Sequence, residues 1–480
     1  MTSIAKYIEQ EIVVSSGDAL LYGETSLGIT NEAARKRLQR LPKDIYKIKG
    51  ICRDGQSILY HKDSWGSPEF FDKLIEVLKN NAKQHYAVLN AINLHHGVIP
   101  KDILPEYTVS PVGKIKGHKS FNSIIKDLIS LHIIEATDDT YKTLGCAYNE
   151  NKSKALNVIH KITIADFCEW GRNIGLFSYN SAKFHTEISS YLFAMTAPSY
   201  IKSLVSKSKN EKPSPAFVVA DILLNREIKK DDIEFFIKKL ENVSMRNPAK
   251  IIPFLIIGTH DKEVYHTLKS NGILVGNIDA LFDKKYSESL YGILNLIENA
   301  GAILKSNPDQ YLKLIKSIEA LSFGKTYNLK GALFEMAVGY YHGQQSCKTL
   351  DISKKISYNN KCREIDVYAE YHNSVVFAEC KGYNHKIEDD YVEKWLSEKI
   401  PVIRDWALRQ DSIRNKQFVF EIWSTGGFTD KSYDKLSIAH NKTKKYQIDF
   451  YDFPQMLQIA KEQKIPHFIE ILNSYYTKEI

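Results

Sequence analysis

The sequence has few of the features that mark specialised classes of protein. It has six cysteines in 480 residues, none in a C-x-x-C pair. This argues against a zinc site or disulfide framework and fits a reducing compartment. No apolar run reaches about 18 residues, so we expect no membrane span. The first residues include acids and have no long apolar core, so we expect no secretory signal and a cytoplasmic location.

The glycine-rich motifs of nucleotide-binding proteins are also absent. Neither G-x-G-x-x-G nor G-x-x-x-x-G-K-[ST] occurs, so nucleotide hydrolysis has no motif support. The composition, 43% hydrophobic and 25% charged, is that of a globular protein. The net charge of +8 permits a polyanionic partner without requiring one. The length predicts two to four domains.

Residues 1–65 have the element order of a winged helix-turn-helix. A helical run breaks at Gly28, and a second helix follows with Thr30 as its N-cap. Two short β-type runs come next, joined by Asp54-Gly55, which favours a two-residue hairpin. The second helix carries the cations Arg35, Lys36, Arg37 and Arg40. Such cations can meet phosphates or guanine edges in the major groove, or form a solvated helix face.

A second winged-helix-like domain is expected over residues 66–150. "HYAVLNAINLHHGVIPKDIL" predicts helix, turn, helix, and "SFNSIIKDLISLHIIEAT" predicts a third helix that runs into a strand. This third helix has fewer cations than its counterpart. DNA contact and protein docking therefore both stay open for this region.

Residues 155–305 have the pattern of an α/β domain. "AFVVADILL" (216–224) and "KIIPFLIIGTH" (250–260) are continuous apolar runs, typical of strands buried on both faces. Amphipathic helices separate the strands. Asp221 lies at a strand, but no E-x-K companion accompanies it. We interpret this as a structural or binding domain; a degenerate relative of the domain after it is a further hypothesis.

The last predicted domain, residues 306–480, sets charged residues into apolar segments. "NLKGALFEMAVGYYHGQQ" has helical spacing and contains Glu335. "EIDVYAEY" and "SVVFAECKGY" alternate with the period of strands; the first contains Asp366, the second Glu379 and Lys381. Hairpin pairing would bring Asp366 near Glu379, and the helix could add Glu335 at the same edge.

Carboxylates among apolar neighbours are costly unless something compensates them. Two or three hard oxygen ligands suit Mg²⁺, with Mn²⁺ as a substitute, and Mg²⁺ also binds phosphate. The metal would activate a water, and Lys381 would stabilise the transition state. The sequence thus predicts a metal-dependent phosphodiesterase site with Glu335, Asp366 and Glu379 as metal ligands. A solvent-facing strand is the alternative, and the complete order of elements disfavours it.

This order resembles the PD-(D/E)XK nuclease superfamily, which has the restriction-endonuclease-like fold with a central mixed sheet. Asp366 matches the family's aspartate, Glu379 its second acid and Lys381 its lysine. Glu335 matches the helix glutamate of many members. Ile365 stands where the name of the family has proline, a common departure.

The resemblance extends from about residue 320 to 465. "FVFEIWSTGGFTDKSYDKLSIA" and "KYQIDFYDFPQMLQIAKE" are similar to the closing strand–helix–strand–helix of Mrr-like restriction endonucleases. Many of those have glutamine where this chain has Glu379. The resemblance implies an Mg²⁺-dependent endonuclease acting on double-stranded DNA, of a microbial restriction or anti-phage defence kind.

Other features leave alternatives open. A basic stretch between the site and the closing strands, with Lys394 and Arg404, is either a phosphate-contacting surface or a solvated helix. The chain could be a nuclease effector gated by a partner or small ligand in the middle domain. It could also be a non-catalytic winged-helix DNA-binding regulator. Since cutting both strands commonly needs two sites, we expect a homodimer or a partner protein.

Overall fold

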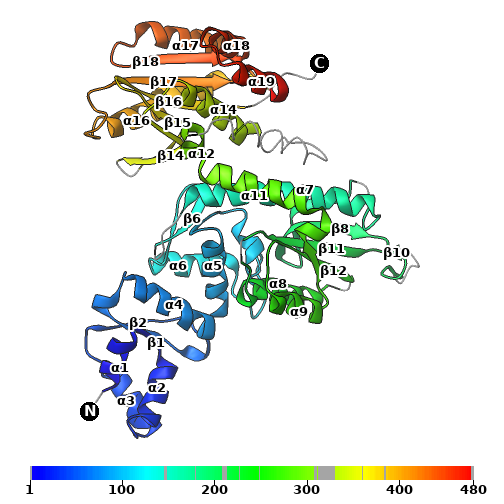
Figure 1. Cartoon of the computed structure of the whole chain (residues 1–480). Helices are drawn as coiled ribbons and strands as arrows, with labels where there is room; N and C mark the ends of the chain where they lie inside the picture. Colours follow the sequence, from blue (N-terminus) through cyan, green and yellow to red (C-terminus); the bar gives the residue numbers. More distant parts are fainter. Residues whose placement is uncertain are drawn as a thin grey trace. The chain divides into compact units, whose positions relative to one another are not determined.

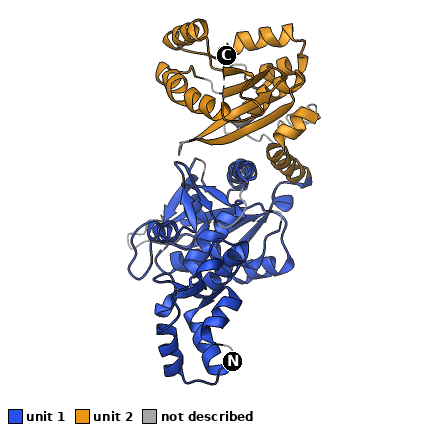
Figure 2. Ribbon diagram, turned by 90° about the vertical axis from the view of Figure 1, so that its left-hand side faces the viewer, with its two compact units in different colours: residues 1–284 blue, residues 285–480 orange. Residues whose placement is uncertain are grey.

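The computed structural model describes residues 3–144, 149–178, 180–207, 213–225, 227–247, 249–306, 311, 330–358, 361–382 and 385–476. The chain forms two compact units, residues 1–284 and 285–480 (Figure 2). Both contain helices and sheets, so the prediction of a mixed α/β protein is confirmed at that level. Among the described helices, none combines the length and the apolar character needed to cross a bilayer.

Unit 1 begins with three helices and a three-stranded antiparallel sheet (Figure 1). In chain order the elements are α1 (Ile4–Glu11), β1 (Val13–Ser15), α2 (Ser16–Thr25), α3 (Asn31–Gln39), β2 (Ile45–Ile48) and β3 (Ile58–His61). The sheet order is β1-β3-β2. Thr30 caps α3 as predicted, since its hydroxyl accepts the Ala33 N–H. Gly28, with φ of 63°, separates α2 from α3.

The hairpin of β2 and β3 is present, but its loop is longer than predicted. Ile48 pairs with Ile58, so Asp54 and Gly55 lie inside the loop 49–57. Both have the positive φ that this dipeptide favours, 57° and 67°. They adopt it in a 3₁₀ turn, η1 (Arg53–Gly55), and not in a two-residue turn.

Residues 66–150 repeat much of this order. The elements are α4 (Pro68–Asn81), α5 (Lys83–Leu94), β4 (Val98–Pro100), η3 (Leu104–Tyr107), α6 (Phe121–Ser130), β5 (Ile134–Ala136) and β6 (Thr140–Thr143). The sheet order β4-β6-β5 matches that of the first sheet. The segment after α5, predicted to be a helix, forms β4 and the short η3. Gly97, with φ of 81°, ends the helical run before β4.

The rest of unit 1 is built on a five-stranded sheet. Its elements are α7 (Glu150–Asn173), β7 (Lys183–Ile188), β8 (Tyr191–Ser199), the short pair β9 (Ser206–Lys207) and β10 (Pro213–Ser214), β11 (Ala216–Leu223), α8 (Lys230–Ser244), β12 (Ile251–Ile257), α9 (Lys262–Ser270), β13 (Leu274–Asn277) and α10 (Ile278–Leu281). The order is β13-β12-β11-β8-β7. The two apolar runs form β11 and β12, neighbouring parallel strands.

One apolar core connects these parts of unit 1. Phe70 of α4, Ile92 of α5 and Ile124 of α6 belong to the same buried cluster as Val219 of β11 and Leu255 of β12. The five-stranded sheet and the preceding helices therefore pack against each other and share one hydrophobic core.

Unit 2 contains a second five-stranded sheet. Its elements are α11 (Lys284–Glu298), α12 (Ala300–Ser306), α14 (Lys330–Gln344), β14 (Thr349–Tyr358), β15 (Lys361–Glu370), β16 (Ser374–Lys381), α15 (Asp389–Lys394), a π-helical turn (Trp395–Lys399), α16 (Ile400–Ala407), β17 (Gln417–Ser424), α17 (Asp430–Lys442), β18 (Gln447–Asp452), α18 (Phe453–Glu462) and α19 (Pro466–Tyr475). The order is β14-β15-β16-β17-β18. Pairing is antiparallel from β14 to β16 and parallel from β16 to β18.

Apolar side chains hold the helices after β16 against this sheet. Trp395 and Ile403 pack in one buried cluster with Phe377 of β16 and Phe420 of β17. This packing fixes the helices that supply two of the side chains described next.

Candidate active site

The two predicted acids lie where β15 and β16 separate. Pairing of the two strands ends at Val367 opposite Ala378, and Asp366 and Glu379 are the next residue on each strand. Both acids are buried, with 7% and 3% of their surface exposed. Asp366 Oδ2 accepts the backbone N–H of Cys380 at 2.7 Å. A carboxylate thereby satisfies a backbone donor near the end of the ladder.

Lys381 joins this pair. Its Nζ lies 2.8 Å from Glu379 Oε1 and 3.8 Å from Asp366 Oδ2. Glu379 and Lys381 share a strand face because the side-chain period is two. The structure therefore brings together the three residues that the sequence pattern selects.

Two further side chains bind Glu379. The Tyr391 hydroxyl of α15 donates to Oε1, and Lys399 pairs with Oε2. Lys399 is the last residue of the π-helical turn, a distortion that often occurs at functional sites. The sequence pattern predicted neither of these two contacts, because helical periodicity does not reveal a π-helical turn.

The charges around the site shift its pKa values in opposite directions. Burial and the charge of Glu379 raise the pKa of Asp366 to about 6. Burial acts in the same direction on Glu379, but Lys399 and Lys381 outweigh it and lower the pKa of that carboxyl. Burial acts to lower the pKa of Lys381, but Asp366 and Glu379 raise it above its usual value. Glu379 and Lys381 are thus charged at neutral pH, and Asp366 loses its proton near pH 6.

Glu335 lies on α14 and accepts a hydrogen bond from Ser353 Oγ at 2.8 Å. Burial raises the pKa of the Cys380 thiol, and Asp366 and then Glu335 raise it further. Glu379 adds to this effect, so all three carboxylates influence this one thiol. Among the described residues, however, no three His, Cys, Asp or Glu side chains are arranged as a metal-binding cluster.

The cations of the basic stretch have different surroundings. Lys394 is exposed at the end of α15. Arg404 is half-buried, with Nη1 3.5 Å from the carboxylate of Asp405. Lys416 is directed into the protein, where it binds Glu370 Oε1 at 2.7 Å. This stretch therefore combines one open cation with others that have structural partners.

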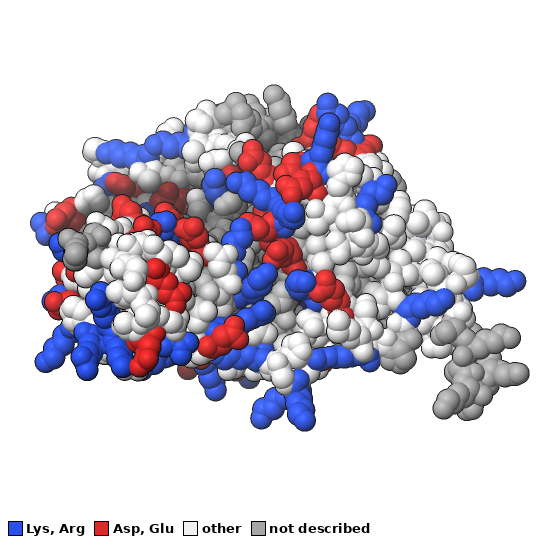
Figure 3. All heavy atoms as spheres, turned by 90° about the horizontal axis from the view of Figure 1, so that it is seen from below, with Lys and Arg blue, Asp and Glu red and all other residues white. Residues whose placement is uncertain are grey.

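In unit 1, α3 presents its predicted cations to solvent. Arg35, Lys36, Arg37 and Arg40 are all exposed. Ala34 and Leu38 on the opposite face are buried. Lys36 pairs with Glu32 at 2.8 Å. Figure 3 shows Lys and Arg side chains interspersed with Asp and Glu over the face seen in that view.

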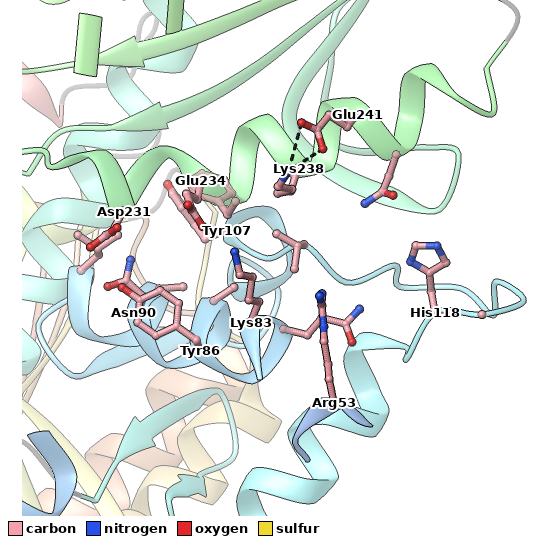
Figure 4. A pocket seen from close by; sticks show the side chains of 18 residues that line it. Arg53, Lys83, Tyr86, Asn90, Tyr107, His118, Asp231, Glu234, Lys238 and Glu241 are labelled. Atoms are coloured by element: carbon pink, nitrogen blue, oxygen red, sulfur yellow. Dashed lines mark hydrogen bonds and ion pairs between the residues drawn. The ribbon is translucent and has the colours of Figure 1, made fainter. Parts of the chain in front are cut away.

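Unit 1 also contains a cavity of about 590 Å³ that the sequence did not suggest. It lies between α5 and α8 and is lined by charges of both signs. Figure 4 shows Asp231 and Glu234 toward one end, and Arg53 and His118 toward the other. Such mixed lining suits a polar ligand but does not select one chemical class.

Comparison with known proteins assigns the chain to no family. No protein-family model, no curated protein and no solved structure matches it. The functional assignment therefore depends on the residues and contacts of this chain.

Proposed function

We propose that the protein is a metal-dependent DNA endonuclease of the PD-(D/E)XK type, with its centre in unit 2. One observation carries the proposal: Asp366, Glu379 and Lys381 converge at the point where β15 and β16 separate. Two neighbouring carboxylates are seldom buried for a purely structural reason, because their burial is costly. The order of helix, three antiparallel strands and two parallel strands supports a restriction-endonuclease-like fold.

The donor set suits a hard divalent cation. Asp366 and Glu379 are close enough for one to raise the pKa of the other, and a positive ion would relieve that repulsion. Asp366 and Glu379 would hold Mg²⁺ or Mn²⁺, and Glu335 would complete or tune the shell. The ion, when bound, would supply an activated water and neutralise charge on the phosphate.

The other side chains act by position and charge. Lys381 would place its ammonium beside the phosphate and stabilise the negative charge of the transition state. Tyr391 and Lys399 would hold the carboxylate of Glu379 in one orientation. In the overall reaction, water oxygen bonds to phosphorus and one P–O ester bond breaks. The leaving oxygen takes up a proton, which leaves a phosphate monoester and a hydroxyl.

The helices of unit 1 would bring the nuclease to duplex DNA. The order α1-β1-α2-α3-β2-β3 is that of a winged helix, in which α3 would be the recognition helix. Its exposed cations Arg35, Lys36 and Arg37, with Arg40 directly after the helix, would contact phosphates or base edges. Lys394 and Arg404 are proposed as phosphate contacts near the centre. A cytoplasmic restriction or anti-phage defence role, as a homodimer or with a partner protein, is part of this proposal.

Cleavage of supercoiled plasmid by the purified protein tests the proposal. Nicking or linearisation that requires Mg²⁺ or Mn²⁺ and stops with EDTA supports it. Duplex DNA binding without cleavage under any metal would instead favour the non-catalytic regulator.

The gated effector is a second candidate, and the cavity of unit 1 favours it. Residues of η1, α5, η3 and α8 line this cavity. A bound ligand would therefore contact residues 1–150, through η1, α5 and η3, and the five-stranded module, through α8. Cleavage that appears only when a small polar ligand or a partner is added would support this form of the proposal.

A further inference from the structure

The five-stranded module of unit 1 has the same topology as the sheet of unit 2. In unit 1 a helix, α7, precedes β7, β8 and β11, and then α8, β12, α9 and β13 follow. In unit 2 the helix α14 precedes β14, β15 and β16, and helices alternate with β17 and β18 in the same way. Both sheets keep their strands in chain order. In both, the first three strands pair antiparallel and the last three parallel.

The strand registers align the two centres. β11 and β16 are both eight-residue strands, and Asp221 has the same position in β11 as Glu379 has in β16. In unit 1 the antiparallel pairing ends at Ala220 opposite Met195, as it ends at Ala378 in unit 2. The register places Ala194 opposite Asp221, where unit 2 has Asp366. The first acid of the nuclease pattern is therefore missing from unit 1.

A lysine from the following helix binds the remaining acid in both modules. Lys239 of α8 pairs with Asp221 Oδ2, as Lys399 pairs with Glu379 Oε2. The position of Lys381 is taken by Leu223, the last residue of β11. Unit 1 thus keeps one acid and one helix lysine of the centre, and lacks the other acid and the strand lysine.

The centre of unit 1 is closed. The side chains of Lys239 and Asp221 are 0% and 1% exposed. Besides Asp221, Lys239 Nζ donates to the carbonyls of Glu106 at 2.7 Å and Leu192 at 2.8 Å, so all three donors of the ammonium are used. Asp221 Oδ1 accepts the Ala194 N–H at 2.8 Å. Both oxygens of the Asp221 carboxylate are therefore bonded to groups of the core.

The segment that covers the Asp221–Lys239 pair is η3, which belongs to residues 66–150. Glu106 and Tyr107 both belong to η3. The Tyr107 hydroxyl donates to the carbonyl of Ile222 at 2.9 Å, one residue after Asp221. The place that would hold substrate in unit 2 therefore holds η3 in unit 1.

We propose that residues 149–284 are an internal copy of the five-stranded module of unit 2, in which a buried ion pair that anchors η3 takes the place of the Asp366, Glu379 and Lys381 cluster. Of these two modules, only that of unit 2 then has a catalytic centre, formed by Asp366, Glu379 and Lys381. The second statement rests on the function proposed above, whereas the first does not.

Stability measurements test the anchor without any cleavage assay. Lys239→Met leaves Asp221 buried without its cation, and its melting temperature should fall by roughly 5–15 °C. Lys238→Met, the neighbouring exposed lysine (49%), is the matched control and should melt like the wild type. The double variant Asp221→Leu, Lys239→Met should recover most of the decrease. A melting temperature unchanged by Lys239→Met would overturn the anchor.

Metal binding and cleavage test the number of centres. Asp366→Asn should abolish cleavage and Mn²⁺ binding measured by electron paramagnetic resonance. Asp221→Asn should keep both, per folded molecule. Residual cleavage in Asp366→Asn that Asp221→Asn removes would overturn the single centre. A wild-type chain that never cleaves would refute the proposed nuclease function and, with it, the single catalytic centre, and would leave the anchor to the melting experiments.

Discussion

Lys381 and Glu379 form an ion pair of 2.8 Å two residues apart on the same face of β16, at the point where β16 leaves β15. Asp366 lies on the other side of that separation, 3.8 Å from the same ammonium. The end of the pairing between β15 and β16 thus brings two acids and a lysine together in the protein interior.

Replacement of Lys381 by Met should remove the charge next to the phosphate while keeping most of the side-chain volume. Cleavage of plasmid should fall by about 100-fold or more, the usual cost of removing a charged group that stabilises the transition state. Lys431→Met, an exposed lysine of α17, is the matched control and should cleave normally. Equal cleavage by the two variants would exclude Lys381 from the reaction.

Asp366→Asn should abolish cleavage and yet stabilise the protein at alkaline pH. The folded pKa of Asp366, about 6, lies above its ordinary value of 3.8, so the folded state binds more protons between these values. Stability therefore falls as the pH rises through this window, and the decrease persists above it. The difference between these two pKa values corresponds to a decrease of roughly 3 kcal/mol in the free energy of unfolding.

Thermal unfolding at pH 4 and pH 8 measures this effect. Asp366→Asn should unfold at a higher temperature than the wild type at pH 8, and at nearly the same temperature at pH 4. An Asn variant that is less stable than the wild type at pH 8 would show that Asp366 is a structural carboxylate, because the ion pair would then outweigh its burial.

Lys399→Met should move the pH dependence of cleavage. Lys399 is the cation that most lowers the pKa of both Asp366 and Glu379, so both pKa values should rise when the Lys399 ammonium is removed. The acidic limb of the pH–rate profile should then move to higher pH, with cleavage partly recovered at alkaline pH. Lys394→Met on the preceding helix is the control for general effects on DNA binding. A profile that falls uniformly at all pH values would contradict the positioning role of Lys399.

The N-terminal helix α3 makes a separate prediction about DNA affinity. Arg35→Ala with Arg37→Ala should weaken duplex binding and reduce the slope of log K against log salt by about 0.9 for each phosphate that the protein no longer neutralises. Lys262→Ala with Lys269→Ala on α9, both exposed, removes the same charge elsewhere in unit 1. Equal effects of the two double variants in a salt titration would contradict a specific DNA contact by α3. Such a result would indicate only a general electrostatic attraction between unit 1 and DNA.

The sequence revealed those parts of the site that depend on local periodicity. Alternation along β15 and β16 predicted that Asp366, Glu379 and Lys381 lie close together, as they do in the structure, because side chains of a strand repeat every two residues. Lys399 and Tyr391 escaped, since their approach to Glu379 depends on packing of α15 and on the π-helical turn. The same holds for Lys239, whose partner Asp221 precedes it by a strand end, a loop and most of α8.

For the fold, too, the elements with a strong local pattern were predicted and those that depend on distant pairing were not. The apolar runs of β11 and β12 identified the middle module, and Thr30 identified the start of α3. The segment after α5 was assigned to a helix, and the three-residue strands β1 and β4 were missed because their stability comes from pairing with distant strands and not from their own short sequences.

Plasmid cleavage by the wild type, Lys381→Met and Asp366→Asn, each with Mg²⁺, Mn²⁺ or EDTA, tests the central claim most directly. The predicted result is metal-dependent nicking or linearisation by the wild type, absent with EDTA and abolished in both variants. Cleavage that both variants retain would contradict the assignment of this centre, and a wild type that binds duplex DNA but never cleaves it, with any metal or added ligand, would contradict the nuclease itself.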